Sequence, residues 1–260
     1  MVVRDLPPGF VRFAIDSSEV VCAKHVSDAV IEALRAGTLY RYAASHAHAR
    51  PLTGRGVAYA VPLPGGVEQV VVRHNRHGGM FASLTGDLFR PPTLAPRELS
   101  NSERLRRAGV PTPLMIGYAV YAAPAGFRRA DVMTREIRPS YDLSTAIMSD
   151  DRSVRERALA ATAVLVAAMN EAKARHHDLN VKNVLLRDGV GGTAEAFVLD
   201  VDRVAFVDDP IAARESNVAR LLRSARKWQS LHGARVTDAE LDALLVAVRD
   251  RRPVLASTLS

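Results

Sequence analysis

The chain has 260 residues, of which 48% are hydrophobic and 24% are charged, so it can bury one large core or two joined lobes and is not disordered throughout. Its formal net charge is +7 and its pI is about 10.0, and only four of its basic residues are lysines. Arginine favours planar contacts with phosphate, but charge alone does not choose among a membrane, an acidic glycolipid and a nucleic acid.

Two features bear on cellular location. Cys22 is the only cysteine, so no internal disulfide can form, and its apolar neighbours favour a buried, inert thiol. Met1–Ile15 lacks the pattern of a signal peptide, and no apolar run reaches the length of a membrane span. We therefore expect a cytoplasmic protein that rests on the inner surface of the membrane and does not cross it.

Strands dominate the expected elements of the first half. Gly9–Ala23 predicts one or two strands, and Ser27 or Asp28 can cap a short helix over Ala29–Ala36. A turn at Gly54, Arg55 and Gly56 leads into a strand, and Val67–Arg73 follows as another. The later elements are a helix over Ala95–Ala108 closed by Gly109, and strands at Met115–Tyr121 and Asp131–Ile137.

Helices dominate the second half. Ser153 and Glu156 match a capping box for a helix that runs to about Arg175, and Ala212–Trp228 predicts another. Thr237 and Glu240 form a second capping box, for a helix to about Arg249. We therefore expect an α+β chain with a β-rich lobe over residues 1–136 and a helical lobe over residues 137–260.

The stretch from His176 to Arg203 carries the chemistry. Two apolar runs separated by Asp-Gly and Gly-Gly turns predict a β-hairpin, which brings Asn183 beside Asp200. An amide oxygen and a carboxylate in that position suit Mg²⁺ with phosphate. Asp178 lies in the loop that enters the hairpin, where its carboxylate can orient a hydroxyl. The stretch predicts a phosphotransfer site.

The same residues resemble a known family. Asp178-Leu179-Asn180-Val181-Lys182-Asn183, with His176 ahead of it, resembles the catalytic loop of kinases, and Asp200-Val201-Asp202 resembles their metal-binding segment with its glycine replaced. The pattern H-x-D-L-N-x-x-N followed by L-D-x-D-R is similar to the lipopolysaccharide kinase (Kdo/WaaP-like) family, where Kdo is 3-deoxy-D-manno-octulosonic acid. Further matches lie at Arg73–Gly79 and Asn217–Ser224.

The resemblance implies a two-lobed protein-kinase-like fold with ATP and Mg²⁺ between the lobes. Arg73 stands where protein kinases carry lysine, and the helix carboxylate that pairs with it is Glu98, with Glu103 as the alternative. Gly54, Arg55 and Gly56 would cover the phosphates. The backbone around Glu136, Ile137 and Arg138 would read adenine.

The resemblance also implies the roles of the catalytic loop. Asp178 would be the catalytic carboxylate, Asn183 and Asp200 would hold the metal, and Asn180 or Lys182 would steady the transferring group.

The implied acceptor is a Kdo sugar on a lipid A precursor, an acidic glycolipid. Arg76 and His77 would line its entrance, and the basic helix over Ala212–Trp228 would contact an anionic membrane. We expect no nucleic-acid or protein partner. Three alternatives stay open: a small-molecule or protein kinase of the same fold; a pseudokinase, suggested by Arg73 and Asp202; and an arginine-rich nucleic-acid binder.

Overall fold

The computed structural model describes residues 6–53, 56–75 and 88–250, which form two compact units. The first unit comprises Met1–Glu103 and Pro113–Glu136, and the second comprises Arg104–Thr112 and Ile137–Ser260. The sequence predicts residues 104–112 in the first lobe. They cluster with the second unit because Leu105 and Val110 are buried in its core.

The first unit is built on a seven-stranded antiparallel sheet with the order β1-β2-β6-β7-β5-β4-β3. The sequence predicted β4, β5, β6 and β7, and one or two strands where the structure has β1 and β2. It missed β3, which lies at the sheet edge and contains Pro51, a residue that edge strands tolerate. The strands are β1 (Phe10–Ile15), β2 (Ser18–Ala23), β3 (Arg50–Thr53), β4 (Val57–Pro62), β5 (Gln69–His74), β6 (Met115–Ala122) and β7 (Arg128–Arg135).

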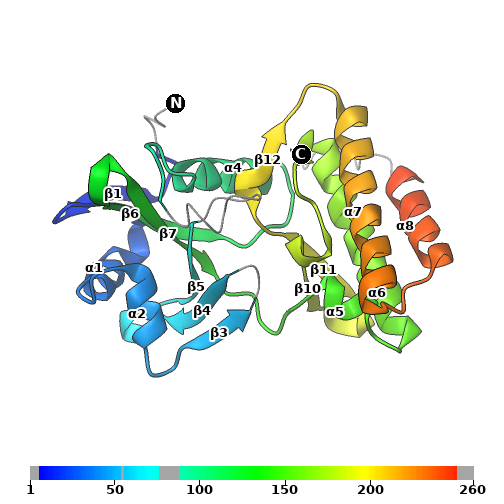
Figure 1. The fold of residues 1–260 in the computed structure, drawn as a ribbon, viewed down its shortest axis with the longest axis horizontal. Helices are drawn as coiled ribbons and strands as arrows, with labels where there is room; N and C mark the ends of the chain where they lie inside the picture. Colours follow the sequence, from blue (N-terminus) through cyan, green and yellow to red (C-terminus); the bar gives the residue numbers. More distant parts are fainter. Residues whose placement is uncertain (1–5, 54–55, 76–87, 251–260) are drawn as a thin grey trace, which may run out of the picture. The chain divides into compact units, whose positions relative to one another are not determined.

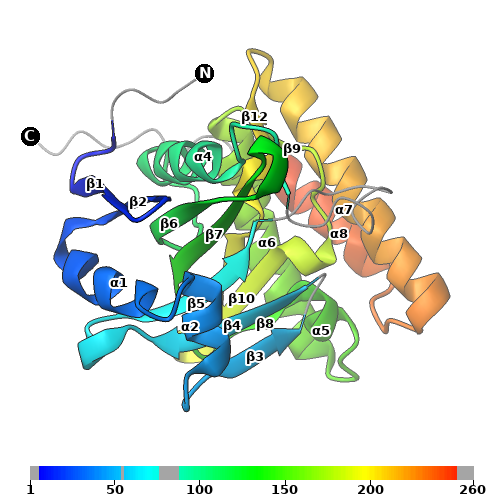
Figure 2. The same cartoon turned by 60° about the vertical axis from the view of Figure 1, so that its left-hand side comes forward.

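Helices cover both faces of this sheet, as Figures 1 and 2 show. Val20 and Cys22 of β2 pack with α1 (Ser27–Leu34) and α2 (Leu39–Ser45). Val21, between them in sequence, packs with α4 (Ala95–Arg107). Successive side chains of a strand point to opposite faces, so one strand contributes to both cores. Cys22 is fully buried, which raises the pKa of its thiol to about 11 and keeps it unreactive.

The start of α1 differs from our prediction. Neither Ser27 nor Asp28 caps it; its N-cap is Val26, which makes no capping hydrogen bond with its side chain. A 3₁₀ turn over Lys24–Val26 runs directly into the helix, and the Ser27 hydroxyl donates to the carbonyl of Lys24 within that turn. The sequence also missed α2, whose seven residues are too few to show a helical period.

Helices pack together in the second unit (Figure 1). They are α5 (Leu143–Ile147), α6 (Arg152–Glu171), α7 (Pro210–His232) and α8 (Asp238–Asp250). The predicted hairpin is present as β10 (Val184–Asp188) and β11 (Ala194–Val198), joined by β8 (Tyr141–Asp142), and β9 (Ala174–His176) pairs with β12 (Val204–Phe206). Leu165 and Met169 of α6, Leu186 of β10 and Leu221 of α7 share one core. None of the helices formed by the described residues combines the length and hydropathy needed to cross a membrane.

One capping prediction was wrong and the other is confirmed. The N-cap of α6 is Asp151, whose carboxylate accepts a hydrogen bond from the backbone N–H of Ser153 at 2.8 Å, so Ser153 already lies inside the helix. The helix ends at Glu171 rather than Arg175, because the chain turns at Lys173, where φ is +55°. At α8 the box forms as predicted: Glu240 accepts from the N–H of Thr237, and Thr237 Oγ1 accepts from the N–H of Glu240.

Candidate active site

The hairpin brings the two ends of its strands together as the sequence predicted. Val184 pairs with Val198, and the backbone N–H of Leu199 donates to the carbonyl of Asn183 at 2.9 Å. Asp200 follows at once, in a left-handed conformation with φ +52° and ψ +47°. Aspartate tolerates this region better than most residues, and the conformation turns the chain sharply after the strand.

The loop before the hairpin closes around the carbonyl of Asp178. Asn183 Nδ2 donates to this oxygen at 2.8 Å, and Asn180 Nδ2 donates to it at 2.9 Å. Since the NH₂ group of Asn183 is directed at Asp178, its Oδ1 is the atom that can serve as an oxygen ligand. The side-chain amide of Asn180 makes hydrogen bonds through both of its ends, because its Oδ1 also accepts from the N–H of Lys182 at 2.9 Å. Both ends of this side chain therefore shape the loop.

His176 connects the loop to the segment before Asp200. Its Nδ1 accepts from the backbone N–H of Asp178 at 3.0 Å, and its Nε2 lies 3.0 Å from the carbonyl of Leu199. A backbone N–H only donates and a carbonyl only accepts, so the ring is neutral with its proton on Nε2. Burial lowers the pKa of His176 and outweighs the opposing effects of the Leu199 carbonyl and of the Asp200 and Asp178 carboxylates.

Helix α7 holds the loop through two side chains that the sequence reasoning had not singled out for this role. Asn217 Oδ1 accepts from the N–H of His176 at 2.9 Å, and its Nδ2 donates to the carbonyl of Ala174 at 2.9 Å. Ser224 Oγ accepts from the N–H of Val181 at 3.2 Å. Asn217 and Ser224 are seven residues apart, about two helical turns, so they share one face. The available signal was the Asn217–Ser224 motif, which contains both.

The ammonium group of Lys182 makes two contacts with side chains outside the loop. Its Nζ lies 2.9 Å from Asp142 Oδ2 and 5.1 Å from the centroid of the Trp228 ring. Burial alone would raise the pKa of Asp142, but hydrogen bonds from Ser144, Lys182 and Thr145 lower it overall, so Asp142 is ionised at neutral pH.

The first unit contains the ion pair predicted from the sequence. Arg73 Nη2 of β5 lies 2.6 Å from Glu98 Oε1 of α4, and the Glu98 side chain is only 4% exposed. Glu98, rather than the alternative Glu103, is therefore the partner of Arg73. A buried carboxylate in direct contact with the guanidinium fixes where this cation points.

Other predicted residues of the first unit have different surroundings. Thr53 of β3 pairs with Val57 of β4. Of the three residues between them, Gly56 is described, whereas Gly54 and Arg55 lie outside the described residues. Arg76 and His77 also lie outside the described residues. The N–H of Glu136 donates to the carbonyl of Gln69 at 2.9 Å and its carboxylate pairs with Arg50, so adenine would have to use other backbone groups. Ile137, the first residue of the second unit after this junction, is half-buried.

Comparison with known proteins identifies the family. Residues 46–247 match the model of the "Lipopolysaccharide kinase (Kdo/WaaP) family". The chain belongs to this family. The Kdo/WaaP relatives include proteins named 3-deoxy-D-manno-octulosonic acid kinase from Vibrio vulnificus YJ016, 29% identical with 77% of this chain and 82% of the relative covered, and from Stenotrophomonas maltophilia K279a, 31% identical with 75% and 76% covered.

A solved structure shows the same kinase-like fold. It is "WaaP in complex with acyl carrier protein", which superimposes with a TM-score of 0.52 at 18% identity and covers 79% of this chain and 80% of its own. The predicted α+β fold, with a sheet-rich first part and a helical second part, is confirmed. As a Kdo/WaaP family member the chain is a kinase that uses ATP.

The metal-ligand set of this family member is small. The residues at 6–53, 56–75 and 88–250 hold no group of three or more His, Cys, Asp or Glu side chains that could bind a metal. Asn183 and Asp200 nevertheless fit Mg²⁺, which proteins commonly hold through one or two side-chain oxygens together with substrate phosphates.

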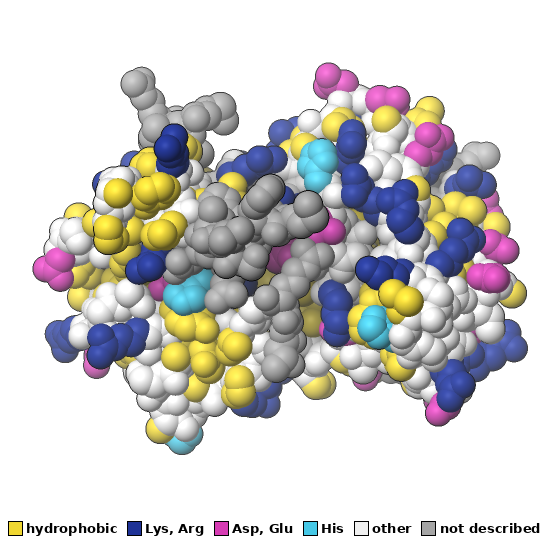
Figure 3. All heavy atoms as spheres, in the orientation of Figure 1, with side chains coloured by type: hydrophobic (Ala, Val, Ile, Leu, Met, Phe, Trp, Pro, Cys, Tyr) yellow, Lys and Arg dark blue, Asp and Glu magenta, His cyan; other side chains and the backbone are white. Residues whose placement is uncertain are grey.

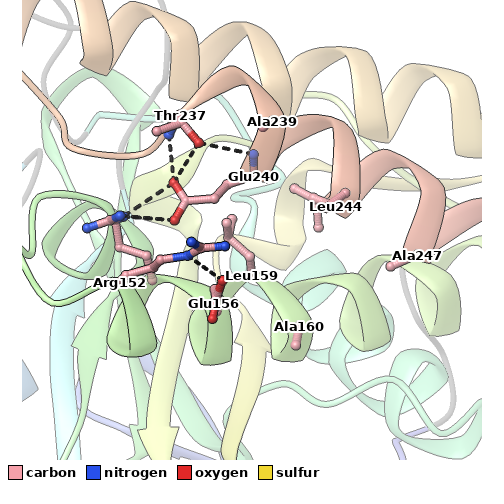
Figure 4. Close-up of a pocket in the computed structure, with 11 residues that line it drawn as sticks. Arg152, Glu156, Leu159, Ala160, Thr237, Ala239, Glu240, Leu244 and Ala247 are labelled. Atoms are coloured by element: carbon pink, nitrogen blue, oxygen red, sulfur yellow. Dashed lines mark hydrogen bonds and ion pairs between the residues drawn. The ribbon is translucent and has the colours of Figure 1, made fainter.

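The second unit also has a cavity of about 460 Å³, and none of the predicted site residues lines it. It lies between α6 and α8, with Leu159 and Leu244 among its apolar lining (Figure 4). Arg155 and Glu240 face one another there at 3.1 Å, each side chain 9% exposed, and Glu240 belongs to the capping box of α8. This ion pair therefore joins two helices, and the cavity lies apart from the candidate active site.

We expect the neutral state of His176 to make stability depend on pH. Its pKa is lower in the folded protein than the usual value of about 6.5 in the unfolded chain, so the unfolded chain binds the proton first as the pH falls. The contribution of His176 to the free energy of unfolding is present above pH ~6.5. It falls below that pH by at most ~1.4 kcal/mol per pH unit. Denaturant unfolding at pH 7.5 and 5.5 measures this.

Comparison with His176→Gln isolates the contribution of this histidine from that of the others. The variant should be less stable by about 1–3 kcal/mol at pH 7.5, because buried backbone partners lose their hydrogen bonds, and should lose part of the pH dependence. His48→Gln, the same change at an exposed site, should behave as the wild type. Equal pH dependence in His176→Gln and wild type would contradict the assignment.

Proposed function

We propose that this kinase transfers the γ-phosphoryl group of ATP to a hydroxyl of a Kdo sugar on a lipid A precursor. The names of the relatives in Vibrio and Stenotrophomonas support this acceptor. The observation that carries the proposal is the closed loop around the Asp178 carbonyl: it fixes Asn183 by its amide, while Asn183 in turn bonds the segment that leads to Asp200.

Asp178 is the group we assign to the attacking hydroxyl. Its backbone is held on both sides, by His176 at the N–H and by Asn180 and Asn183 at the carbonyl, so its carboxylate is positioned by the loop. The carboxylate would accept the hydrogen bond of the sugar hydroxyl, orient the oxygen toward the phosphorus, and take its proton late in the transfer. Because such transfer is mainly positioning and charge stabilisation, a rigid loop supplies much of the catalysis.

Asn183 Oδ1 and the Asp200 carboxylate are the proposed ligands of Mg²⁺. When bound, the metal neutralises charge on the phosphate oxygens. We assign Asn180 to positioning, because both ends of its side chain are used within the loop. Lys182 is the remaining candidate for contact with an anionic group on the substrate.

The first unit would supply groups for the nucleotide. Arg73, fixed by Glu98, is the proposed cation for the phosphates, and Gly54, Arg55 and Gly56, which lie between β3 and β4 in the sequence, would cover them. The carbonyl of Glu136 and the backbone of Ile137 are the proposed contacts for adenine, since the N–H of Glu136 already bonds to Gln69.

We also propose that α7 contacts an anionic membrane, where a glycolipid acceptor would lie. Arg223, Arg226 and Lys227 are exposed on this helix. Figure 3 shows Lys and Arg side chains gathered over the part of the second unit where Figure 1 places α7. Basic residues at a membrane surface contribute about 1 kcal/mol each with anionic lipids.

Asp178→Ala tests the catalytic assignment. The variant should transfer phosphate from labelled ATP to the Kdo-lipid A precursor about 100- to 10,000-fold more slowly, while calorimetric titration shows unchanged ATP affinity, because the carboxylate acts on the acceptor. Asp188→Ala, at an exposed position in the same hairpin, is the matched control.

The acceptor panel should include aminoglycosides and generic protein substrates beside the Kdo-lipid A precursor. Transfer to an aminoglycoside or a protein substrate but not to the precursor would refute the proposed acceptor. Persisting activity in Asp178→Ala would sink the mechanism.

Arg73→Gln should raise the KM for ATP about 10- to 100-fold, because a charge-assisted contact to phosphate is worth about 1.5–3 kcal/mol. Glu98→Gln should have a smaller effect in the same direction, since the cation remains but is no longer held by a charged partner. Steady-state kinetics at saturating acceptor measures both. Arg135→Gln, which removes a cation paired with Glu68, is the control, and an unaltered KM in Arg73→Gln would refute the role.

Replacing Arg223, Arg226 and Lys227 together by glutamine should weaken binding to vesicles about 100-fold when a third of the lipid is phosphatidylglycerol, from about 1 kcal/mol per charge. Co-sedimentation with vesicles measures this, with pure phosphatidylcholine vesicles as the uncharged comparison. Arg107→Gln with Arg249→Gln removes exposed charge from other helices and should change little. Equal binding by the triple variant would exclude α7 as the contact.

A further inference from the structure

Helix α7 contacts the catalytic loop at three positions along its length. Asn217 binds Ala174 and His176, Ser224 binds Val181, and Trp228 lies beneath Lys182. Trp228 is four residues beyond Ser224, about 6 Å further along the axis. Asn217 and Ser224 make hydrogen bonds between buried or half-buried groups. The contact of Trp228 with Lys182 is different, because it places a ring and a cation at a partly exposed position.

The surroundings of Trp228 are both aromatic and cationic. The ring is half-buried against the core of the second unit, with the Lys182 ammonium 5.1 Å from its centroid. The centroid of the His232 ring, one turn further along α7, lies 4.5 Å from that of the Trp228 ring, and the two ring planes are inclined at 42°. The Lys182 side chain is 46% exposed, and Arg223 and Lys227, five residues and one residue before Trp228 on α7, are also exposed.

The Lys182 ammonium is held in place but is not saturated by its described contacts. An ammonium group has three N–H donors, and the contact with Asp142 Oδ2 uses one of them. Asp142 is itself fixed, since its other oxygen accepts from Ser144 and Thr145 at the start of α5. A rigidly held cation with unused donors beside an aromatic ring is suited to an anionic group attached to an apolar surface.

We infer that Trp228 and Lys182 form a subsite for an acidic sugar of the acceptor. The C–H face of a pyranose carries slight positive charge and would lie against the electron-rich indole. A carboxylate or phosphate on the same glycolipid would accept hydrogen bonds from Lys182. This inference rests on the proposed function, because it places the subsite four residues after Asp178, the residue assigned to the attacking hydroxyl.

The wild-type protein carries its own probe for this subsite. Trp228 is the only tryptophan in the chain, so intrinsic indole fluorescence reports on this ring alone. Titration with free Kdo, without ATP, should give a saturable change in emission and protection from acrylamide quenching. Glucosamine 1-phosphate tests a phosphate instead of a carboxylate, and glucose is the uncharged control.

The titrations separate the possible ligands. Saturation with Kdo alone assigns the carboxylate, and saturation with glucosamine 1-phosphate alone assigns the phosphate; either supports the subsite. No saturable change with either acidic sugar, or an equal change with glucose, overturns it.

Variants then test the subsite in catalysis. Trp228→Leu should raise the KM for the Kdo-lipid A precursor at least tenfold while leaving the KM for ATP unchanged, and Trp228→Phe should keep most of the acceptor affinity because a ring remains. Leu231→Ala, at a 64% exposed position on the same turn of α7, is the matched control and should behave as the wild type.

The outcomes distinguish this inference from the function on which it rests. Absence of transfer to the precursor by the wild type defeats the proposed acceptor, whereas normal transfer with an unchanged acceptor KM in Trp228→Leu defeats the subsite alone. A parallel loss of ATP affinity, acceptor affinity and thermal stability in Trp228→Leu would show that the ring only supports the core, and would also overturn the inference.

Discussion

The candidate active site depends on one backbone oxygen, the carbonyl of Asp178. It accepts hydrogen bonds from the amides of Asn180 and Asn183, and this arrangement turns a flexible polar loop into one with a fixed shape. Asn183 is 4% exposed and His176 is fully buried, so their polar atoms need hydrogen-bond partners within the protein, and the backbone of the loop supplies them. The geometry of the loop that carries the proposed catalytic groups thus follows from the requirement to satisfy buried donors and acceptors.

Helix α7 has different tasks on its two sides. Its buried side fixes the loop through Asn217 and Ser224 and joins the core through Leu221. Its outer side carries the exposed cations Arg223, Arg226 and Lys227. Because a helix is rigid over this length, the surface proposed to meet lipid and the residues proposed to bind the sugar are held in a constant relation to the loop.

The first unit uses a different constraint to fix its cation. Arg73 projects from β5 toward α4, where Glu98 is almost completely buried. A buried carboxylate that lost this partner would be strongly destabilising, so the pair holds the arginine in one orientation. An arginine gives two N–H groups in a plane where a lysine gives a single point charge, which suits a phosphate group.

The sequence alone determined the parts that depend on local order. Short apolar runs with Asp-Gly and Gly-Gly between them determined the hairpin, and the spacing of Thr237 and Glu240 determined the start of α8. The family motifs located Asp178, Asn183 and Asp200, and the position of Glu98 in its helix predicted the partner of Arg73. In each case the interacting residues are close in sequence or belong to a pattern with fixed spacing.

Only the tertiary structure decided the contacts between distant segments. The hydrogen bonds from Asn217 and Ser224 to the loop, and the position of Lys182 between Asp142 and Trp228, join residues 40 to 46 positions apart. The tautomer of His176 depends on Leu199, 23 positions away. The cap of α6 also required the structure, because Asp151 and Ser153 are both good capping residues and it is Asp151 that takes the N-cap position. Local propensity does not determine which surfaces meet when a chain folds, and these choices therefore required the coordinates.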